Sequence, residues 1–199
     1  MTPFVYPSRP HIRRHEPRGY AEYGRFLPWL RDEFMFRCVY CLRREQWGRA
    51  SGELQIDHFL AIAHRPELKA DYDNLLLACP ICNVLKGSLA LPDPCRVLTA
   101  DAVIVDEDGT IRAHKREARR LIRMLALDER QATEFRLLWN SIATLARRFD
   151  PGLWRKIMGF PEVLPDLRRL HPPGGNLRPD GVAQSWLARR ERGELPEFS

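Results

Sequence analysis

The residues with the clearest chemistry are four cysteines in two Cys-x-x-Cys pairs, Cys38 with Cys41 and Cys79 with Cys82. Each short turn can aim two thiolates at one ion, and four thiolates complete a closed, tetrahedral site of the structural kind. A redox pair or unrelated core thiols would also place cysteines here. Two pairs in one short chain favour structural Zn²⁺, with a sizeable element between the pairs. Cys95 is left over, and we assign it no role.

The segment between the cysteine pairs carries side chains suited to acid–base and metal chemistry. Apolar and polar residues alternate over 53–58, which predicts a strand that ends in Asp57 and His58. Asn74 follows after a gap, and Asn83 lies on a short helix predicted directly after the second cysteine pair. A neutral imidazole can accept a proton from water near pH 7. Carboxylate and amide oxygens suit Mg²⁺ or Mn²⁺ better than zinc.

Neighbouring residues of an ideal strand point to opposite faces. Asp57 and His58 can therefore serve one centre only where the strand ends and turns. Taken singly, each candidate has a plainer role: a structural histidine, a helix-capping Asn74, an Asn83 bonded to backbone, and a solvated Lys86. Their joint position beside two cysteine pairs favours a catalytic site.

The order of the motifs, Cys-x-x-Cys, Asp-His, Asn-Leu and Cys-x-x-Cys-Asn-x-x-Lys, resembles the HNH endonucleases, in which two strands and a helix hold one catalytic metal. The resemblance covers residues 30–90. It implies that His58 is the general base, and that Asp57 and Asn83 hold the catalytic metal. It also implies that Asn74 orients His58 and braces the loop, and that the products carry 5′-phosphate and 3′-hydroxyl ends.

One stretch departs from the family pattern. The family often has a proline soon after Asp-His and a Gly-Gly before the Asn, whereas residues 59–67 have neither in its usual place. We therefore expect a differently shaped loop and do not carry over the family's substrate contacts. Asn83 stands where many members have a histidine, which is a common variation.

Composition and charge favour a globular protein with a basic surface. The chain has 199 residues, 44% of them apolar and 29% charged, and its formal net charge is +6. Arginine supplies most of the positive charge, and its planar fork can bond two phosphate oxygens. No apolar run is long enough to cross a membrane, and the start lacks the pattern of a secretory signal, so we expect a cytoplasmic protein. Candidate nucleic-acid contacts are Lys86, Arg65, Arg116, Arg119, Arg120 and Arg123, although a solvated face accounts for the last four equally well.

The elements that must position the site are predicted from periodicity and turn residues. Residues 20–96 form the predicted core, with a helix over 28–36 before the first cysteine pair. Residues 97–160 add a β-hairpin over 97–113 and two helices, the second with Asp128 as a candidate N-cap. Their apolar stripes are most simply core: Ala118, Leu121, Ile122 and Leu125 in the first, and Phe135, Leu138, Trp139, Ile142 and Leu145 in the second.

The two ends of the chain lack such periodicity. Residues 1–19 hold four prolines and four arginines, which predicts a basic arm without regular structure. A solvated tail is the simpler interpretation, and contact with phosphate is the alternative. Residues 161–199 are rich in proline and glycine, which predicts a linker or poorly ordered tail with one short helix near 184–192. The predicted fold class is α+β: a zinc-braced ββα-metal core, a flanking hairpin and C-terminal helices.

Three functions fit these features. The favoured one is a metal-dependent endonuclease with structural Zn²⁺ and catalytic Mg²⁺ or Mn²⁺, acting on nucleic acid, with DNA the favoured substrate and bacterial defence one setting. The second is a non-catalytic zinc module that binds nucleic acid or scaffolds a partner, which has no need of Asp57, His58 and both asparagines. The third is a nuclease subunit that cuts only with a partner protein docked on the helices over 114–158.

Overall fold

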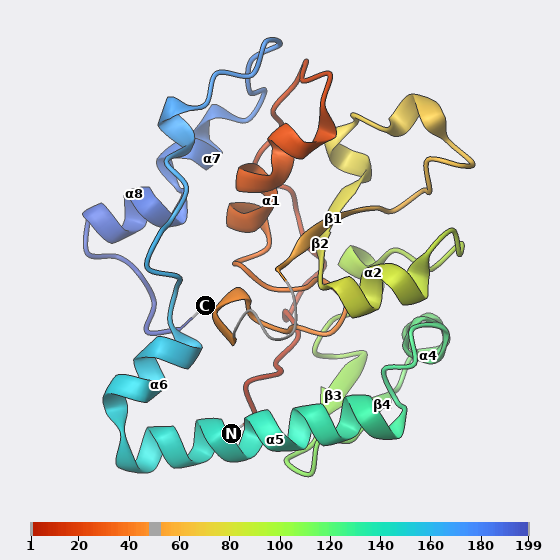
Figure 1. Ribbon diagram of the computed structural model, residues 1–199, viewed down its shortest axis with the longest axis vertical. Coiled ribbons are helices and arrows are strands. Elements are labelled where there is room, and N and C mark those ends of the chain that lie inside the picture. Colours follow the sequence, from red (N-terminus) through yellow and green to blue (C-terminus); the bar gives the residue numbers. More distant parts are fainter. Residues whose placement is uncertain (1, 48–52, 199) are drawn as a thin grey trace.

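The structure, a computed structural model, describes residues 2–47 and 53–198. Its strands are β1 (Gln55–His58), β2 (Leu75–Ala78), β3 (Val103–Val105) and β4 (Ile111–Ala113). Its helices are α1 (Leu27–Glu33), α2 (Pro80–Lys86), α3 (Pro94–Val97), α4 (Arg116–Met124), α5 (Arg130–Phe149), α6 (Pro151–Met158), α7 (Pro179–Ala183) and α8 (Trp186–Glu191). The fold is α+β, as predicted, with two small antiparallel sheets, β1 with β2 and β3 with β4, and helices packed around them (Figure 1).

The predicted ββα unit is present at the centre of the molecule. β1 and β2 pair antiparallel, with Gln55 opposite Ala78 and His58 opposite Leu75. All of β2 is buried because its side chains are apolar on both faces, whereas in β1 only Asp57 is buried. α2 begins directly after β2 with Cys79 at its N-cap, and Gly87 follows it with a positive φ of 47°.

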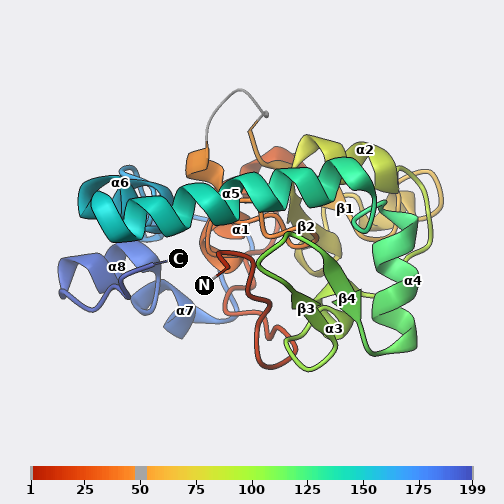
Figure 2. The same cartoon turned by 90° about the horizontal axis from the view of Figure 1, so that it is seen from below.

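The predicted hairpin is also present, and its turn packs closely on a helix. Gly109 has a φ of 84°, and a Cβ built on it would lie 2.4 Å from the carbonyl oxygen of Thr133 in α5. Only glycine fits there, since both the backbone conformation and the close approach exclude a side chain. The turn therefore fixes the hairpin against α5, which runs along one side of the molecule with α6 at its end (Figure 2).

The apolar stripe predicted for α4 is confirmed, because all four of its residues are buried. The stripe predicted for α5 is wrong in part: Leu138 and Leu145 are 57% and 58% exposed, while Arg136 and Asn140 are buried. The helix is turned so that Arg136 Nε donates to the carbonyl oxygen of Gly109 at 2.6 Å. Buried turn carbonyls need donors, and Arg136 supplies one. The predicted Asp128 cap does not form, since Glu129 is the N-cap and makes no side-chain cap bond.

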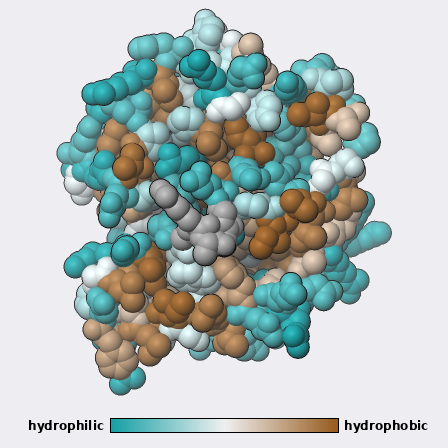
Figure 3. Space-filling model, in the orientation of Figure 1, coloured by the Kyte–Doolittle hydropathy of each residue, from teal (hydrophilic) through white to brown (hydrophobic). Residues whose placement is uncertain are grey.

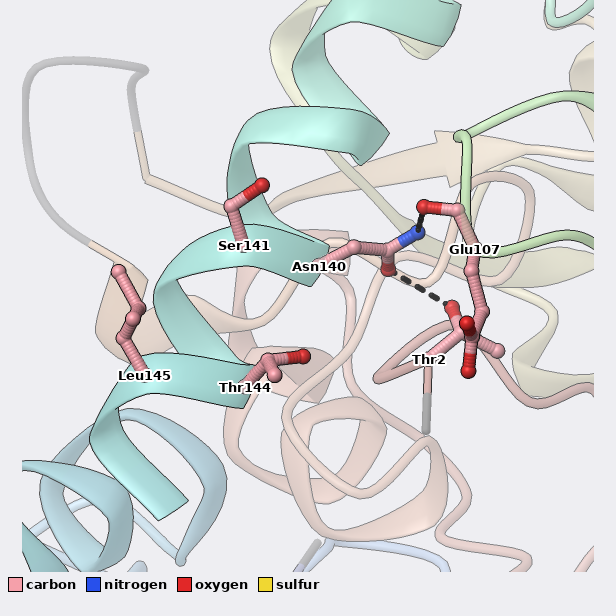
Figure 4. A pocket seen from close by; sticks show the side chains of 6 residues that line it. All are labelled: Thr2, Glu107, Asn140, Ser141, Thr144 and Leu145. Atoms are coloured by element: carbon pink, nitrogen blue, oxygen red, sulfur yellow. Dashed lines mark hydrogen bonds between the residues drawn. The ribbon is translucent and has the colours of Figure 1, made fainter. Parts of the chain in front are cut away.

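Asn140 joins three separate parts of the chain beside a small pocket (Figure 4). Its Nδ2 donates to the carbonyl oxygens of Asp106 and Glu107 in the hairpin turn, at 3.1 and 2.9 Å. Its Oδ1 accepts from the hydroxyl of Thr2 at 2.9 Å. A buried carboxamide with both ends bonded specifies one docking of the hairpin and the N-terminal arm on α5.

The N-terminal arm forms no helix or strand over residues 2–19, as expected, but it is not a solvated tail. Phe4, Tyr6 and His15 are buried. The carboxylates at the end of α1 hold the arm: His15 Nε2 lies 2.8 Å from Asp32 Oδ1, and the backbone N–H groups of Arg14 and His15 donate to Glu33. The arm docks because the aromatic side chains of Phe4 and Tyr6 supply apolar area for burial. The basic charge pattern, on which the prediction of a solvated tail rested, gives no sign of this.

The C-terminal segment is likewise packed rather than loose. The short helix predicted near 184–192 is present as α8, and its Trp186 is buried. Trp186 donates its backbone N–H to Asp32 Oδ2 and its indole N–H to the carbonyl oxygen of Asp32, both at 2.8 Å. Asp32 therefore binds both terminal segments to α1. This helix contacts β1 and β2, the two strands of what we call the central hairpin.

Candidate active site and metal cluster

The four cysteines of the two pairs form one cluster. Their sulfur atoms all lie within 4.8 Å of one another, and the Sγ atoms of Cys41 and Cys79 are 3.7 Å apart. A tetrahedral zinc with Zn–S bonds of about 2.3 Å needs sulfur atoms about 3.8 Å apart, so the cluster fits Zn²⁺. Within residues 2–47 and 53–198 this is the one group of three or more His, Cys, Asp or Glu that gathers its ligand atoms.

A bound cation would also change the protonation of the cluster. Burial holds the pKa of the Cys38 thiol well above its usual range, and the neighbouring thiol of Cys41 adds to this. Several thiolates cannot ionise side by side in a buried place unless a cation compensates their charge. The donor set, four sulfurs without an open position, is that of a structural site.

His58 lies at the end of β1 with one ring nitrogen occupied. Its Nε2 is 2.9 Å from the carbonyl oxygen of Lys69, and its ring meets the ring of Tyr23 edge-on at 4.9 Å. A carbonyl can only accept, so Nε2 carries the proton and, in the neutral ring, Nδ1 keeps its lone pair. This is the tautomer that a general base needs, with Nδ1 as the accepting atom.

Asn74 braces the loop that carries the Lys69 carbonyl. Its Oδ1 accepts from the backbone N–H of Leu60 at 2.8 Å, and its Nδ2 donates to the carbonyl oxygens of Leu60 and Leu68 at 3.0 and 3.3 Å. The side chain thus ties the two ends of the loop together. The side chain does not bond His58 itself but holds Leu60 and Leu68, the second of which precedes Lys69, so its influence on the imidazole is indirect.

The buried carboxylate of Asp57 is bound by two donors, one at each oxygen. Its Oδ2 accepts from the Tyr40 hydroxyl at 2.6 Å, and its Oδ1 lies 3.0 Å from Lys86 Nζ. Burial, with the charge of Asp57 adding to it, raises the pKa of Tyr40, so the hydroxyl remains a donor. Tyr40 was not among the predicted site residues, because its partner lies on a different element. Its position inside the Cys-x-x-Cys turn is the signal that could have identified it.

The prediction that Lys86 contacts nucleic acid is not supported by its position. The side chains of Lys86 and Asp57 are 1% and 3% exposed. The ammonium also donates to the carbonyl oxygens of His58 and Gly87, at 2.5 and 3.4 Å. A buried ammonium needs an opposite charge and filled donor positions, and this environment supplies both. Lys86 therefore neutralises Asp57 rather than facing solvent.

Asn83 lies one turn before Lys86 on the same side of α2. Its Nδ2 donates to Gln55 Oε1 at 3.2 Å, which leaves its Oδ1 available as a ligand. Gln55 and Asp57 share one face of β1, so Asn83 and Asp57 line the same interface between strand and helix. Among the described residues, no hydrogen bond joins the side chains of His58, Asp57 and Asn83 to one another.

The residues present fit a hard divalent cation in donor chemistry. Each carboxylate oxygen has two acceptor positions, so Asp57 keeps one on each oxygen beyond Tyr40 and Lys86, and Asn83 offers an amide oxygen. The ammonium of Lys86 opposes such an ion, since it is a second cation at the same carboxylate.

The remaining candidate residues lie on the surface. Arg65 is exposed and pairs with Glu67. The arginines of α4 point away from its buried stripe: Arg116, Arg119, Arg120 and Arg123 are all exposed. Helical spacing places them on one side of α4, which gives that helix a basic face.

Comparison with known proteins supports the interpretation of the core. No curated protein matches the chain. No helix in the described part of the chain combines the length and hydropathy that a membrane crossing needs. Residues 38–89 match the family model described as HNH endonuclease. This segment holds both cysteine pairs, the ββα unit and the Asp-His, Asn-Leu and Asn-x-x-Lys motifs, so the resemblance inferred from the motifs is confirmed for residues 38–89.

Proposed function

We propose that the chain is an HNH endonuclease that hydrolyses phosphodiester bonds in DNA, with His58 as its general base. The observation that carries the proposal is the hydrogen bond from His58 Nε2 to the Lys69 carbonyl oxygen, which leaves Nδ1 as the basic nitrogen. The match of residues 38–89 to a nuclease family supports the activity. The net charge of +6 and the arginines of α4 support a phosphate-bearing partner.

In the proposed reaction, Nδ1 of His58 takes a proton from water as the water oxygen bonds to phosphorus. The bond from phosphorus to the 3′ oxygen breaks, and that oxygen takes up a proton from solvent. The products are a 5′-phosphate and a 3′-hydroxyl. Asp57 and Asn83 would hold Mg²⁺ or Mn²⁺, which neutralises charge on the phosphate when bound. Zn²⁺ on the four cysteines would have a structural role, and cysteines that serve as metal ligands rather than in disulfides support a cytoplasmic location.

The test compares wild type with His58→Ala on supercoiled, linear and single-stranded DNA in Mg²⁺ and in Mn²⁺. We expect wild type to nick or cut, and the variant to lose at least about 10²-fold in rate, as expected when a general base is removed. Zinc content and the thermal midpoint should remain unchanged, because the imidazole bonds only one carbonyl. Equal cleavage by both proteins would exclude His58 as the base.

One observation favours the partner-dependent alternative. A groove of about 690 Å³ between α2 and the start of α5 is lined in part by Ile81, Leu85, Leu127 and Phe135. Apolar side chains also gather at the surface where α5 and α6 lie (Figure 3). Exposed apolar surface of this kind often marks a protein contact. Cleavage that begins only when a partner protein is added would identify this case.

A further inference from the structure

The metal cluster and the candidate catalytic strand are joined by one side chain, Tyr40. It lies between the two cysteines of the first pair, its ring is fully buried, and its hydroxyl donates to Asp57 Oδ2 at 2.6 Å. We infer that Tyr40 is a positioning residue that transmits the geometry of the metal cluster to the carboxylate of Asp57. The inference rests on the proposed function, in which Asp57 holds the divalent cation.

The backbone around Tyr40 is held from several directions. The N–H of Val39 donates to the carbonyl oxygen of Leu77 in β2 at 2.9 Å, which attaches the cysteine turn to the central hairpin. The hydroxyl of Tyr6, also buried, donates to the carbonyl oxygen of Tyr40 at 2.8 Å. The cysteines on either side belong to the cluster. Tyr40 is therefore fixed relative to β2, and through β2 relative to β1.

Lys86 and Tyr40 constrain Asp57 in different ways. Lys86 comes from α2 and approaches Oδ1 as a compact charge on a flexible stem, which attracts the carboxylate without selecting its rotation. The last torsion of an aspartate is broad and roughly two-fold, so a charge alone leaves it poorly defined. The hydroxyl of Tyr40 is a directional donor on a rigid ring and binds the other oxygen. Together they leave one rotation, in which each oxygen keeps one free acceptor position.

The experiment uses the full zinc-loaded chain and two matched variants. Tyr40→Phe removes only the hydroxyl that reaches Asp57. The control, Tyr72→Phe, removes another buried tyrosine hydroxyl, one that donates to Glu33, a carboxylate outside the site. Zinc content is measured by elemental analysis, Mn²⁺ affinity by electron paramagnetic resonance, and kcat and KM on plasmid DNA.

We expect Tyr40→Phe to retain its zinc, to bind Mn²⁺ about tenfold more weakly and to lose about tenfold in kcat with KM unchanged, as expected for one hydrogen bond to a charged group. Tyr72→Phe should stay within about twofold of wild type in each quantity. In an Asp57→Asn background, Tyr40→Phe should have no further effect, because the group that it positions is absent.

The outcomes separate the two proposals. Wild type that binds Mn²⁺ but cuts no DNA overturns the proposed function, while the Mn²⁺ affinities still decide the inference. Wild type that cuts DNA, with Tyr40→Phe equal to it in kcat and Mn²⁺ affinity, overturns the inference alone. Loss of zinc from Tyr40→Phe assigns the residue a structural role and also overturns it. Wild type that neither binds Mn²⁺ nor cuts overturns both.

Discussion

At the scale of single residues, the chemistry of the site depends on what each polar group is bonded to. His58 is paired with a carbonyl oxygen, which selects its tautomer. Asp57 and Lys86 form a buried ion pair, and each satisfies the other. A buried pair of this kind contributes little by its presence, but losing either member leaves an uncompensated charge. A substitution of one of the two residues therefore also reports on the other.

Lys86→Met should destabilise the protein by about 3 kcal/mol or more, because it leaves the Asp57 carboxylate buried without a counter-charge. Mn²⁺ should then raise the thermal midpoint of Lys86→Met more than that of wild type, since the competing ammonium is gone. The measurement is thermal unfolding with and without Mn²⁺. Lys115→Met, which removes an exposed ion pair with Asp101, should change little. The idea of competition fails if Mn²⁺ shifts both midpoints equally.

Glu33 should make stability depend on pH in the acid range. Burial alone raises its pKa, but the hydrogen bond and charge of His11 and the N–H of Arg14 lower it from 4.5 to about 2. A depressed folded-state pKa gives stability that is present above pH 4.5 and is lost as the pH falls towards 2. The shift corresponds to about 3 kcal/mol at neutral pH.

Glu33→Gln tests this dependence through urea midpoints measured between pH 7 and pH 2. Wild type should be the more stable protein at pH 7, and its advantage should shrink steadily below pH 4.5. A difference that stays constant over this range would show that the carboxylate charge does not hold the arm.

At the scale of elements, the ββα unit is too small to be stable by itself. β1 and β2 have four residues each and α2 has seven, so backbone pairing and apolar burial within the unit are limited. The two cysteine turns hold the outer ends of this unit, because Val39 pairs with Leu77 and Cys79 caps α2. Metal binding at the cysteines should therefore be part of the folding free energy of the core.

Cys82→Ser should lose the zinc, because the three remaining thiolates do not complete a tetrahedral site. Loss of the metal should expose the backbone of residues 38–89. Hydrogen–deuterium exchange read by mass spectrometry should show faster exchange in that segment than in wild type. Cys95→Ser is the matched control, since Cys95 is outside the cluster. Unchanged protection of residues 38–89 in Cys82→Ser would contradict a structural role for the metal.

At the scale of the whole molecule, the two ends of the chain complete the core. The arm binds the carboxylates of Asp32 and Glu33, and α8 binds that of Asp32. α1 in turn packs on β1 and β2. The central hairpin is thus supported by segments far from it in sequence. Such long-range support makes residues 38–89 dependent on the rest of the chain rather than an independent unit.

Removal of residues 2–15 should destabilise the protein by about 3–6 kcal/mol, because it exposes the surfaces that Phe4 and Tyr6 cover. Urea unfolding followed by tryptophan fluorescence measures the loss. Ile12→Ser, which changes an exposed side chain of the same arm, is the control and should leave the midpoint in place. A truncated chain as stable as wild type would mean that the arm does not dock in solution.

The sequence by itself determined the local chemistry and the central elements. Four thiols at fixed spacing, the Asp-His strand end and the helix after the second cysteine pair follow from short-range patterns, and the structure contains all of them. The catalytic roles of His58, Asp57, Asn74 and Asn83 stay predictions. Short-range patterns succeed here because turns, strand alternation and the spacing within each Cys-x-x-Cys pair depend on neighbouring residues alone.

The tertiary structure decided which polar groups meet. It buried Lys86 against Asp57 and bonded the Tyr40 hydroxyl to the same carboxylate. It also turned α5 so that Arg136 rather than Leu138 faces inward, and docked both terminal segments on α1. Each outcome joins groups distant in sequence, and each satisfies a buried charge or carbonyl that no local pattern displays. Pairing of buried polar groups is a property of the assembled molecule, so it could be found only there.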